Sequence, residues 1–286
     1  MTILELSDVS YTYDKGTPMA HAALVNINLK IEKGLLTGII GHTGCGKSTM
    51  LRMFNGLLKP DSGKILLDGK DIWENPKEIS HVRFKVGLVM QYPEYQLFDE
   101  TVRADIAYGP RNMGLDDDEI ARRVKEAAAF TGVTDDMLER SPFELSGGQK
   151  RRVAIAGIMA MRPEVLVLDE PAAGLDPKGR EDIFFGIERY CRESGASVII
   201  VSHSMEDMAR YCDRLVVMND AEIYMEGTQK EVFGDAEKLM KIGLGVPEIT
   251  KLISILRREG MPIPDDIYTV DDAKGALLSL FGGERA

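Results

Sequence analysis

The chain has few of the sequence features that mark disulfide- or zinc-stabilised proteins, membrane-spanning proteins and secreted proteins. Its three cysteines, Cys45, Cys191 and Cys212, form no CxxC pair, so we expect neither a disulfide framework nor a zinc site. Its longest apolar runs, such as 35–40 and 198–201, are much shorter than the ~20 residues of a membrane-spanning helix. The first residues lack the basic and apolar segments of a signal peptide. We therefore expect a protein of a reducing compartment that does not cross a membrane by itself.

The chain is also poor in positive charge relative to negative charge. It has 35 Lys and Arg residues against 46 Asp and Glu residues, which gives a net charge of −11. A nucleic-acid-binding protein usually carries a basic surface, because contacts to phosphate supply most of its affinity. We therefore expect no nucleic-acid partner. The 44% of hydrophobic residues is ordinary for a globular protein and is enough for a sizeable core.

Short apolar segments alternate with helical patterns along most of the chain. This alternation predicts an α/β fold in which helices cover both faces of a parallel sheet. The first 40 residues have a β-rich pattern, and a helical stretch from about 99 to 161 interrupts the sheet as an inserted subdomain. A tail begins near residue 236. Strands are expected at 35–40, 86–90, 165–168, 198–201, 215–218 and 222–225, and helices at 101–108, 117–131, 147–161, 178–193 and 205–211.

Residues 41–48 match the phosphate-binding pattern G-x-x-x-x-G-K-[ST] in full. This segment follows an apolar strand and opens a helix expected from Lys47 to about Leu58. Backbone N–H groups of such a loop, together with the helix N-terminus, bind phosphate. Lys47 would reach the β- and γ-phosphates, and the Ser48 hydroxyl would bind Mg²⁺. The residues expected to contact a nucleotide here are Gly41, His42, Thr43, Gly44, Cys45, Gly46, Lys47, Ser48 and Thr49.

Two acidic residues follow the apolar segment 165–168. A buried strand that ends in Asp169 delivers a carboxylate to the phosphate site, where it can hold the Mg²⁺ shell. Glu170 is placed to polarise a water molecule for in-line attack on the γ-phosphate. The phosphate loop alone does not choose among kinases, GTPases and ATPases, but together the two motifs predict a Mg-nucleotide site.

A second anion-binding helix terminus is expected after Leu145. Ser146 is a natural N-cap, and Gly147 and Gly148 leave backbone N–H groups open ahead of Gln149. One nucleotide has only one triphosphate tail. We therefore infer that this terminus serves a nucleotide held mainly by another copy or relative of the protein.

In order and spacing, these motifs resemble those of ABC transporter nucleotide-binding subunits, over residues 3 to 235. The phosphate loop, the LSGGQ segment 145–149 and the acidic strand end 165–170 carry the resemblance. It implies a P-loop NTPase (ABC ATPase) domain at 1–235, with an N-terminal antiparallel β part and the inserted helical subdomain, followed by a small helical extension at 236–286. It also implies ATP and Mg²⁺ as cofactors, and a head-to-tail dimer with two ATP molecules between the phosphate loops and the opposing LSGGQ segments.

The same resemblance implies roles for single residues. Glu170 would be the general base, His203 a sensor of the γ-phosphate, and Gln91 the link between the Mg²⁺ site and a membrane partner. Tyr13 resembles the aromatic residue that stacks on adenine, and Tyr11 is the alternative. The catalytic set is then Glu170, His203, Lys47 and Gln91, the metal set is Ser48, Gln91 and Asp169, and Ser146, Gly147, Gly148, Gln149 and Asp176 also contact nucleotide. Asp176 could also cap the helix expected near Pro177.

A narrower resemblance is to the ATPases of energy-coupling-factor transporters, which import vitamins and metal ions. It rests on segment 92–98, on residues 149–157 and on the tail from Pro247 to Phe281. The second-type ATPase is indicated by Gly16-Thr-Pro18 and Pro93-Glu94. This resemblance implies a heterodimer with a sister ATPase, a transmembrane coupling subunit and a small substrate-binding membrane protein, at the cytoplasmic face of the membrane. A homodimer in isolation, a conventional ABC transporter and a soluble ABC ATPase are the alternatives.

Two surfaces are expected to meet these partners. Segment 92–98, with its Tyr, Leu and Phe side chains, is expected to face the coupling subunit. In the tail, Ile249, Leu252, Ile253 and Leu256 form an apolar stripe. This stripe is expected either to bind the sister ATPase or to fold back on its own domain.

Overall fold

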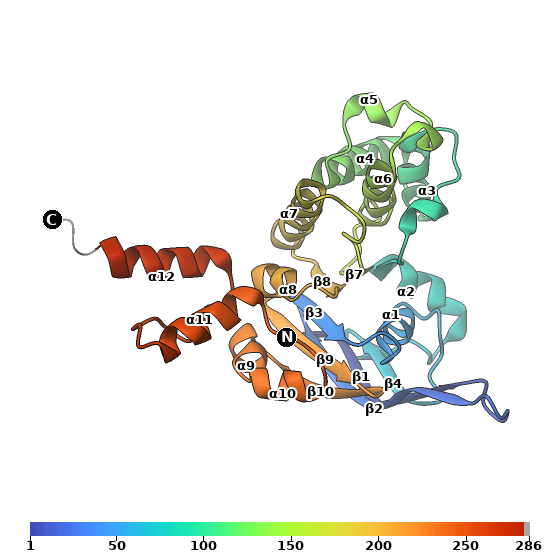
Figure 1. The fold of residues 1–286 in the computed structure, drawn as a ribbon. Helices are drawn as coiled ribbons and strands as arrows, with labels where there is room; N and C mark the ends of the chain where they lie inside the picture. Colours follow the sequence, from blue (N-terminus) through green and yellow to red (C-terminus); the bar gives the residue numbers. More distant parts are fainter. Residues whose placement is uncertain (283–286) are drawn as a thin grey trace.

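A computed structural model describes residues 1–282 of the chain (Figure 1). Within these residues, two sheets form the framework. A four-stranded antiparallel sheet has the order β2-β1-β4-β5, and a six-stranded sheet has the order β10-β9-β3-β8-β7-β6. The first sheet contains β1 (Thr2–Tyr13), β2 (His21–Glu32), β4 (Ser62–Leu67) and β5 (Lys70–Asp71). The second contains β3 (Leu36–Gly41), β6 (Val86–Val89), β7 (Val165–Asp169), β8 (Ser197–Val201), β9 (Arg214–Asn219) and β10 (Glu222–Gly227).

The central strands of the larger sheet are parallel and buried. Every residue of β3, β7 and β8 is buried, which explains why their sequences are runs of apolar residues without alternation. The register aligns Asp169 of β7 with Val201 of β8, and Val201 with Ile39 of β3. The phosphate loop, Glu170 and His203 therefore follow strands that end at the same edge of the sheet, where ligands bind in open α/β sheets.

The helical subdomain interrupts the sheet between β6 and β7, as the sequence predicts. Figure 1 shows it above the sheets, with the adjacent helix α7 beside it. The subdomain and α7 are in close contact at Gly186. A Cβ atom added at Gly186 of α7 would collide with the backbone carbonyl of Phe130. The helices involved are α3 (Val102–Asn112), α4 (Asp117–Thr131), α5 (Asp135–Leu138), α6 (Gly147–Met159) and α7 (Pro177–Ser194), and the short turns η2 (Pro93–Gln96) and η3 (Pro142–Glu144) flank them.

The tail packs mainly on itself, which neither expectation for its apolar stripe had foreseen. Leu244, Val246 and Tyr268 join the main core, whereas Ile253 of the stripe packs with Ile263 and Ala273 in a small separate cluster. Figure 1 shows α11 and α12 projecting from the sheets. The helices after β8 are α8 (Met205–Tyr211), α9 (Gln229–Phe233), α10 (Ala236–Lys241), α11 (Glu248–Arg258) and α12 (Val270–Gly282). The last four residues of the predicted extension 236–286 lie outside the described residues.

Other element boundaries differ modestly from the prediction. Helix α1 (Lys47–Phe54) ends before Leu58, because the chain turns at Gly56 with a left-handed φ of 67°. The sequence analysis did not foresee β4, whose first half is exposed, or the pair η1 (Pro76–Glu78) and α2 (Ile79–Lys85). Among residues 1–282, no helix is both long and apolar enough to span a membrane.

Candidate functional site

A cavity of about 350 Å³ collects most of the predicted nucleotide residues. It opens where β3, β7 and β8 end, and β1 and β2 close one side of it. The residues that line it are Tyr13, His21, Ala23, Thr43, Gly44, Gly46, Lys47, Ser48, Thr49, Gln91, Asp169, Glu170, Val201 and His203. Eleven of these were predicted from the sequence as catalytic, nucleotide-binding or metal-binding residues; His21, Ala23 and Val201 were not.

The phosphate loop has the geometry of an anion cradle. Gly46 adopts a left-handed φ of 104°, and a Cβ there would collide with the carbonyl oxygen of Ala23. Helix α1 begins directly after it, and no side chain caps its first turn. The first N–H groups of α1 are therefore available to an anion at the positive end of the helix dipole.

Lys47 and Ser48 join this loop to the acidic strand end. The buried ammonium group of Lys47 donates hydrogen bonds to the carbonyl oxygens of Gly41 and His42, at 2.6 and 2.7 Å. The Ser48 hydroxyl donates to Oδ2 of Asp169 at 2.8 Å. A hydroxyl and a carboxylate in contact are hard oxygen donors of the kind that Mg²⁺ prefers, and Gln91 adds an amide oxygen in the same cavity.

Glu170 is held in an unusual conformation and environment. Its backbone is left-handed, with a φ of 52°, and its N–H donates to the carbonyl of Val201 at 3.0 Å. Its buried Oε1 has no hydrogen-bond partner and lies 3.4 Å from Nε2 of His203. Burial, and the nearby charge of Asp169, raise the pKa of Glu170 to about 7. A carboxyl group with this pKa can accept a proton near neutral pH, as a general base must.

The neighbouring His203 is shifted toward its neutral form. Burial lowers its pKa, and the charge of Lys47 adds to that effect. A neutral imidazole keeps one N–H donor, which can point at an anionic oxygen. His203 therefore has the chemistry of a hydrogen-bond donor to phosphate at this edge of the cavity.

Tyr13 reaches the cavity, whereas the alternative Tyr11 does not line it. The Tyr13 hydroxyl lies 3.2 Å from Oγ1 of Thr49, and the Tyr11 ring packs edge-on against the Tyr13 ring at 4.9 Å. The sequence analysis missed His21, Ala23 and Val201. His21 has no local signal, because its place follows from its pairing with Tyr13 across the β1–β2 register.

The remaining predicted residues lie outside this cavity. Ser146 caps α6 in a reciprocal capping box with Gln149, and Gly147 and Gly148 open that helix. Asp176 caps α7 by accepting from the N–H of Gly179 at 2.6 Å. In the phosphate loop, Gly41, His42 and Cys45 do not line the cavity: the Cys45 thiol is buried 3.8 Å from Nζ of Lys47, and Nε2 of His42 contacts the carbonyl of Ile242.

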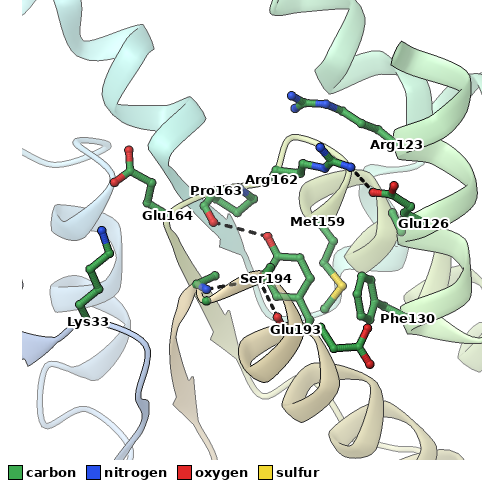
Figure 2. A pocket seen from close by; sticks show the side chains of 14 residues that line it. Lys33, Arg123, Glu126, Phe130, Met159, Arg162, Pro163, Glu164, Glu193 and Ser194 are labelled. Atoms are coloured by element: carbon green, nitrogen blue, oxygen red, sulfur yellow. Dashed lines mark hydrogen bonds and ion pairs between the residues drawn. The ribbon is translucent and has the colours of Figure 1, made fainter. Parts of the chain in front are cut away.

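A larger cavity of about 740 Å³ lies elsewhere, where α4, α7 and the start of β7 meet (Figure 2). Two of its arginines are engaged in ion pairs: Arg162 pairs with Glu126, and Arg123 donates to Glu119 and to the carbonyl of Met161. Neither the phosphate loop nor the strand-end carboxylates line it. Size alone therefore does not identify the site.

The raised pKa of Glu170 can be tested in the absence of nucleotide, because it changes the stability of the fold with pH. Because its pKa is about 7 in the folded chain and ordinarily 4.5, the protonated side chain stabilises the fold at low pH. This contribution is complete below about pH 4.5 and is lost as the pH rises through about 7. We expect the stability of Glu170→Gln relative to the parent chain to grow between about pH 5 and about pH 8, by ~2–3 kcal/mol.

This difference is measured by urea unfolding at a series of pH values. A matched control is Glu164→Gln, next to the start of the same strand, where the carboxylate pairs with Lys85 at the surface. Its relative stability should not grow over this range. A flat difference for Glu170→Gln as well would contradict the assigned environment of Glu170.

Comparison with known proteins places the chain in a family. The ABC transporter model matches residues 24–173. The energy-coupling factor transporter ATP-binding protein EcfA2 of Caldanaerobacter subterraneus is 51% identical over 282 residues, which cover 99% of each protein.

Solved structures agree with this match. The structure of cbiO1 from Clostridium perfringens, described as part of the ABC transporter complex cbiONQ, has a TM-score of 0.75 and 41% identity, covering 88% of this chain and 99% of that one. A dimeric ATP-binding cassette in a post-hydrolysis state with ADP and Pi has a TM-score of 0.71 and 30% identity, covering 79% and 98%. The chain therefore belongs to the ABC transporter family and, within it, to the ATP-binding proteins of energy-coupling factor transporters.

Proposed function

We propose that this chain binds Mg-ATP in the cavity described above and hydrolyses it to energise the import of a vitamin or metal ion. The observation that carries the proposal is the convergence, in one cavity, of the phosphate loop, the Ser48–Asp169 pair and Glu170 with its pKa of about 7. Family membership supports the ATPase activity and the coupling to transport. The class of cargo and the role of each residue belong to this proposal.

The phosphates would be held mainly by the loop and by Lys47. The ammonium group of Lys47 now binds carbonyls of its own loop, and it lies close enough to the cradle to exchange them for phosphate oxygens. Ser48, Asp169 and Gln91 would hold Mg²⁺, which neutralises charge on the phosphates when bound. Tyr13 would stack on adenine beside the cradle.

Hydrolysis would then use Glu170 and His203, the two residues of the cavity whose pKa values are shifted. Glu170 would take a proton from a water molecule as its oxygen bonds to the γ-phosphorus and the bond to the β–γ bridging oxygen breaks, which leaves ADP and phosphate. His203 would donate its N–H to a γ-phosphate oxygen, as its neutral form allows. The left-handed backbone of Glu170 would hold the carboxylate toward the cavity.

One chain would supply only half of each complete site. Ser146, Gly147, Gly148 and Gln149 lie on α6 outside the cavity, so they would serve the nucleotide of an opposing subunit, together with Asp176. The dimeric form of a similar cassette supports this arrangement. We propose a sister ATPase as the opposing subunit, with a homodimer possible for the isolated chain.

A groove beside the helical subdomain is the proposed contact with the membrane partners. A cavity of about 300 Å³ lies between segment 92–98 and helices α3 and α6, and Leu97, Phe98 and Tyr108 line it. Tyr95 is 86% exposed and Phe98 is 59% exposed. An apolar groove rimmed by exposed aromatic side chains fits a helix of a transmembrane coupling subunit. That subunit would hold the chain at the cytoplasmic face of the membrane, next to a small substrate-binding membrane protein.

Replacing the proposed base separates ATP binding from hydrolysis. Glu170→Gln keeps the size and polarity of the side chain but cannot accept the proton, so we expect ATP binding to persist and turnover to fall roughly a hundredfold or more. Phosphate release and fluorescent-nucleotide binding measure the two properties. Glu164→Gln, next to the start of β7, should keep both. Near-normal turnover in Glu170→Gln would remove the assignment.

Charging the proposed groove should release the chain from membranes. Tyr95→Asp combined with Leu97→Asp places carboxylates where apolar contacts are proposed, so most of the chain should move to the soluble fraction. ATP affinity should stay within about twofold of the parent chain, since neither residue lines the nucleotide cavity. Phe185→Asp on α7 is the control, because Phe185 is an exposed aromatic residue that does not line the groove. Unchanged membrane association of the double variant would refute this docking surface.

A further inference from the structure

Arg151 is a buried guanidinium group on α6 that touches two other segments of the chain. Its Nε and Nη2 atoms donate to the two carboxylate oxygens of Glu94, at 3.1 and 2.8 Å. Its Nη1 atom donates to the backbone carbonyl of Ala173. The ring of Tyr92 lies 5.9 Å from its Cζ atom. The side chains of Arg151 and Glu94 are only 4% and 16% exposed.

Each contact of Arg151 lies next to a part of the proposed machinery. Glu94 and Tyr92 belong to the segment that follows Gln91 and that we propose faces the membrane partner. Ala173 lies between Glu170 and Asp176, in the loop after β7. Arg151 itself lies on α6, two residues after Gln149, the last residue of the LSGGQ segment. One side chain therefore joins the membrane-facing segment, the LSGGQ helix and the loop that follows the proposed base.

Arg151, Glu94 and Tyr92 form a cluster that stabilises a strained backbone conformation at Tyr92. Tyr92 adopts a left-handed φ of 57°, which is unfavourable by ~1–3 kcal/mol for a residue with a bulky side chain. The cation over its ring and the bidentate ion pair two residues later both stabilise this conformation. A movement of Glu94 would therefore reach Ala173 through one rigid, planar group.

Stability alone is a weak reason for such an arrangement. A buried ion pair often contributes little more than an apolar pair of the same volume, because both charges lose their hydration. Its geometry, in contrast, is specific, since the fork of Arg151 bonds a carboxylate and a carbonyl at once. Arg123 in α4 offers a useful comparison: it also donates to one carboxylate, of Glu119, and one carbonyl, of Met161, but it reaches neither of these segments.

We propose that Arg151 is a positioning residue that couples segment 92–98 to the loop 171–176, so that displacement of Glu94 changes the placement of the groups around the γ-phosphate. This inference rests on the proposed function for the direction in which the signal runs. The contact itself does not depend on it. Arg151 would act on turnover and on its control by the membrane partner, with little effect on ATP affinity.

The test is a double-substitution cycle with Glu94→Gln, Arg151→Lys and both together in the full chain. Glu94→Gln alters only the far side of the cluster, and Arg151→Lys keeps the charge but cannot bond Glu94 and Ala173 in the same way. Hydrogen exchange is measured without nucleotide at the backbone amides of 172–176, since residue 171 is a proline, and kcat and KM are measured with ATP. Arg123→Lys is the matched control, because the side chain of Arg123 is also mostly buried, with 14% exposed; Figure 2 shows Arg123 near Arg162 and Glu126, beside the larger cavity.

We expect Glu94→Gln to accelerate exchange in 172–176 roughly tenfold, although Glu94 has no hydrogen bond to that loop, and to lower kcat while KM changes less than about twofold. In the Arg151→Lys background, Glu94→Gln should add little to either effect. Arg123→Lys should leave both measurements unchanged. Additive effects, or exchange in 172–176 that ignores Glu94, would overturn the proposal. Because exchange is measured without ATP, this failure is separate from a failure of the ATPase assignment.

Discussion

The site depends on two carboxyl groups at the end of one buried strand. Strand β7 is buried along its whole length between β6 and β8, so its end is fixed relative to the phosphate loop that follows β3. Asp169 meets Ser48 directly, whereas Glu170 has a left-handed backbone and a buried Oε1 atom without a hydrogen-bond partner. The two carboxyl groups thus acquire different chemistry. One fits a hard metal ion, and the other fits proton transfer near neutral pH.

Much of this site could be predicted from the sequence because its motifs are local. The phosphate loop, the acidic strand end and the LSGGQ segment each set their own backbone geometry, and parallel strands bring their ends to one edge. The six strands of the larger sheet and the inserted helices follow from the periodicity of apolar residues. Helix α4 was predicted with its observed bounds, since Asp116 caps one end and Gly132 ends the other.

The features that were missed are non-local. His21 enters the cavity through pairing with Tyr13, and Arg151 meets Glu94 across 57 residues of sequence. The periodicity of apolar residues does not indicate which residues far apart in the sequence come into contact. The tail shows the same limit: its stripe was correctly apolar, but the sequence did not reveal that Ile253 packs against Ile263 and Ala273 rather than against the main domain. Leu252 and Ile255 of α11 stay about half exposed, which leaves a face that a sister subunit could cover.

The central claim is that this ATPase works as one part of a membrane importer. It is tested most directly by purifying the Glu170→Gln chain from gently solubilised membranes with Mg-ATP present and identifying its partners by mass spectrometry. The account predicts a second ATPase, one transmembrane coupling protein and one or more small membrane proteins. Recovery of a conventional permease pair, or of soluble partners with nothing from the membrane, would contradict it.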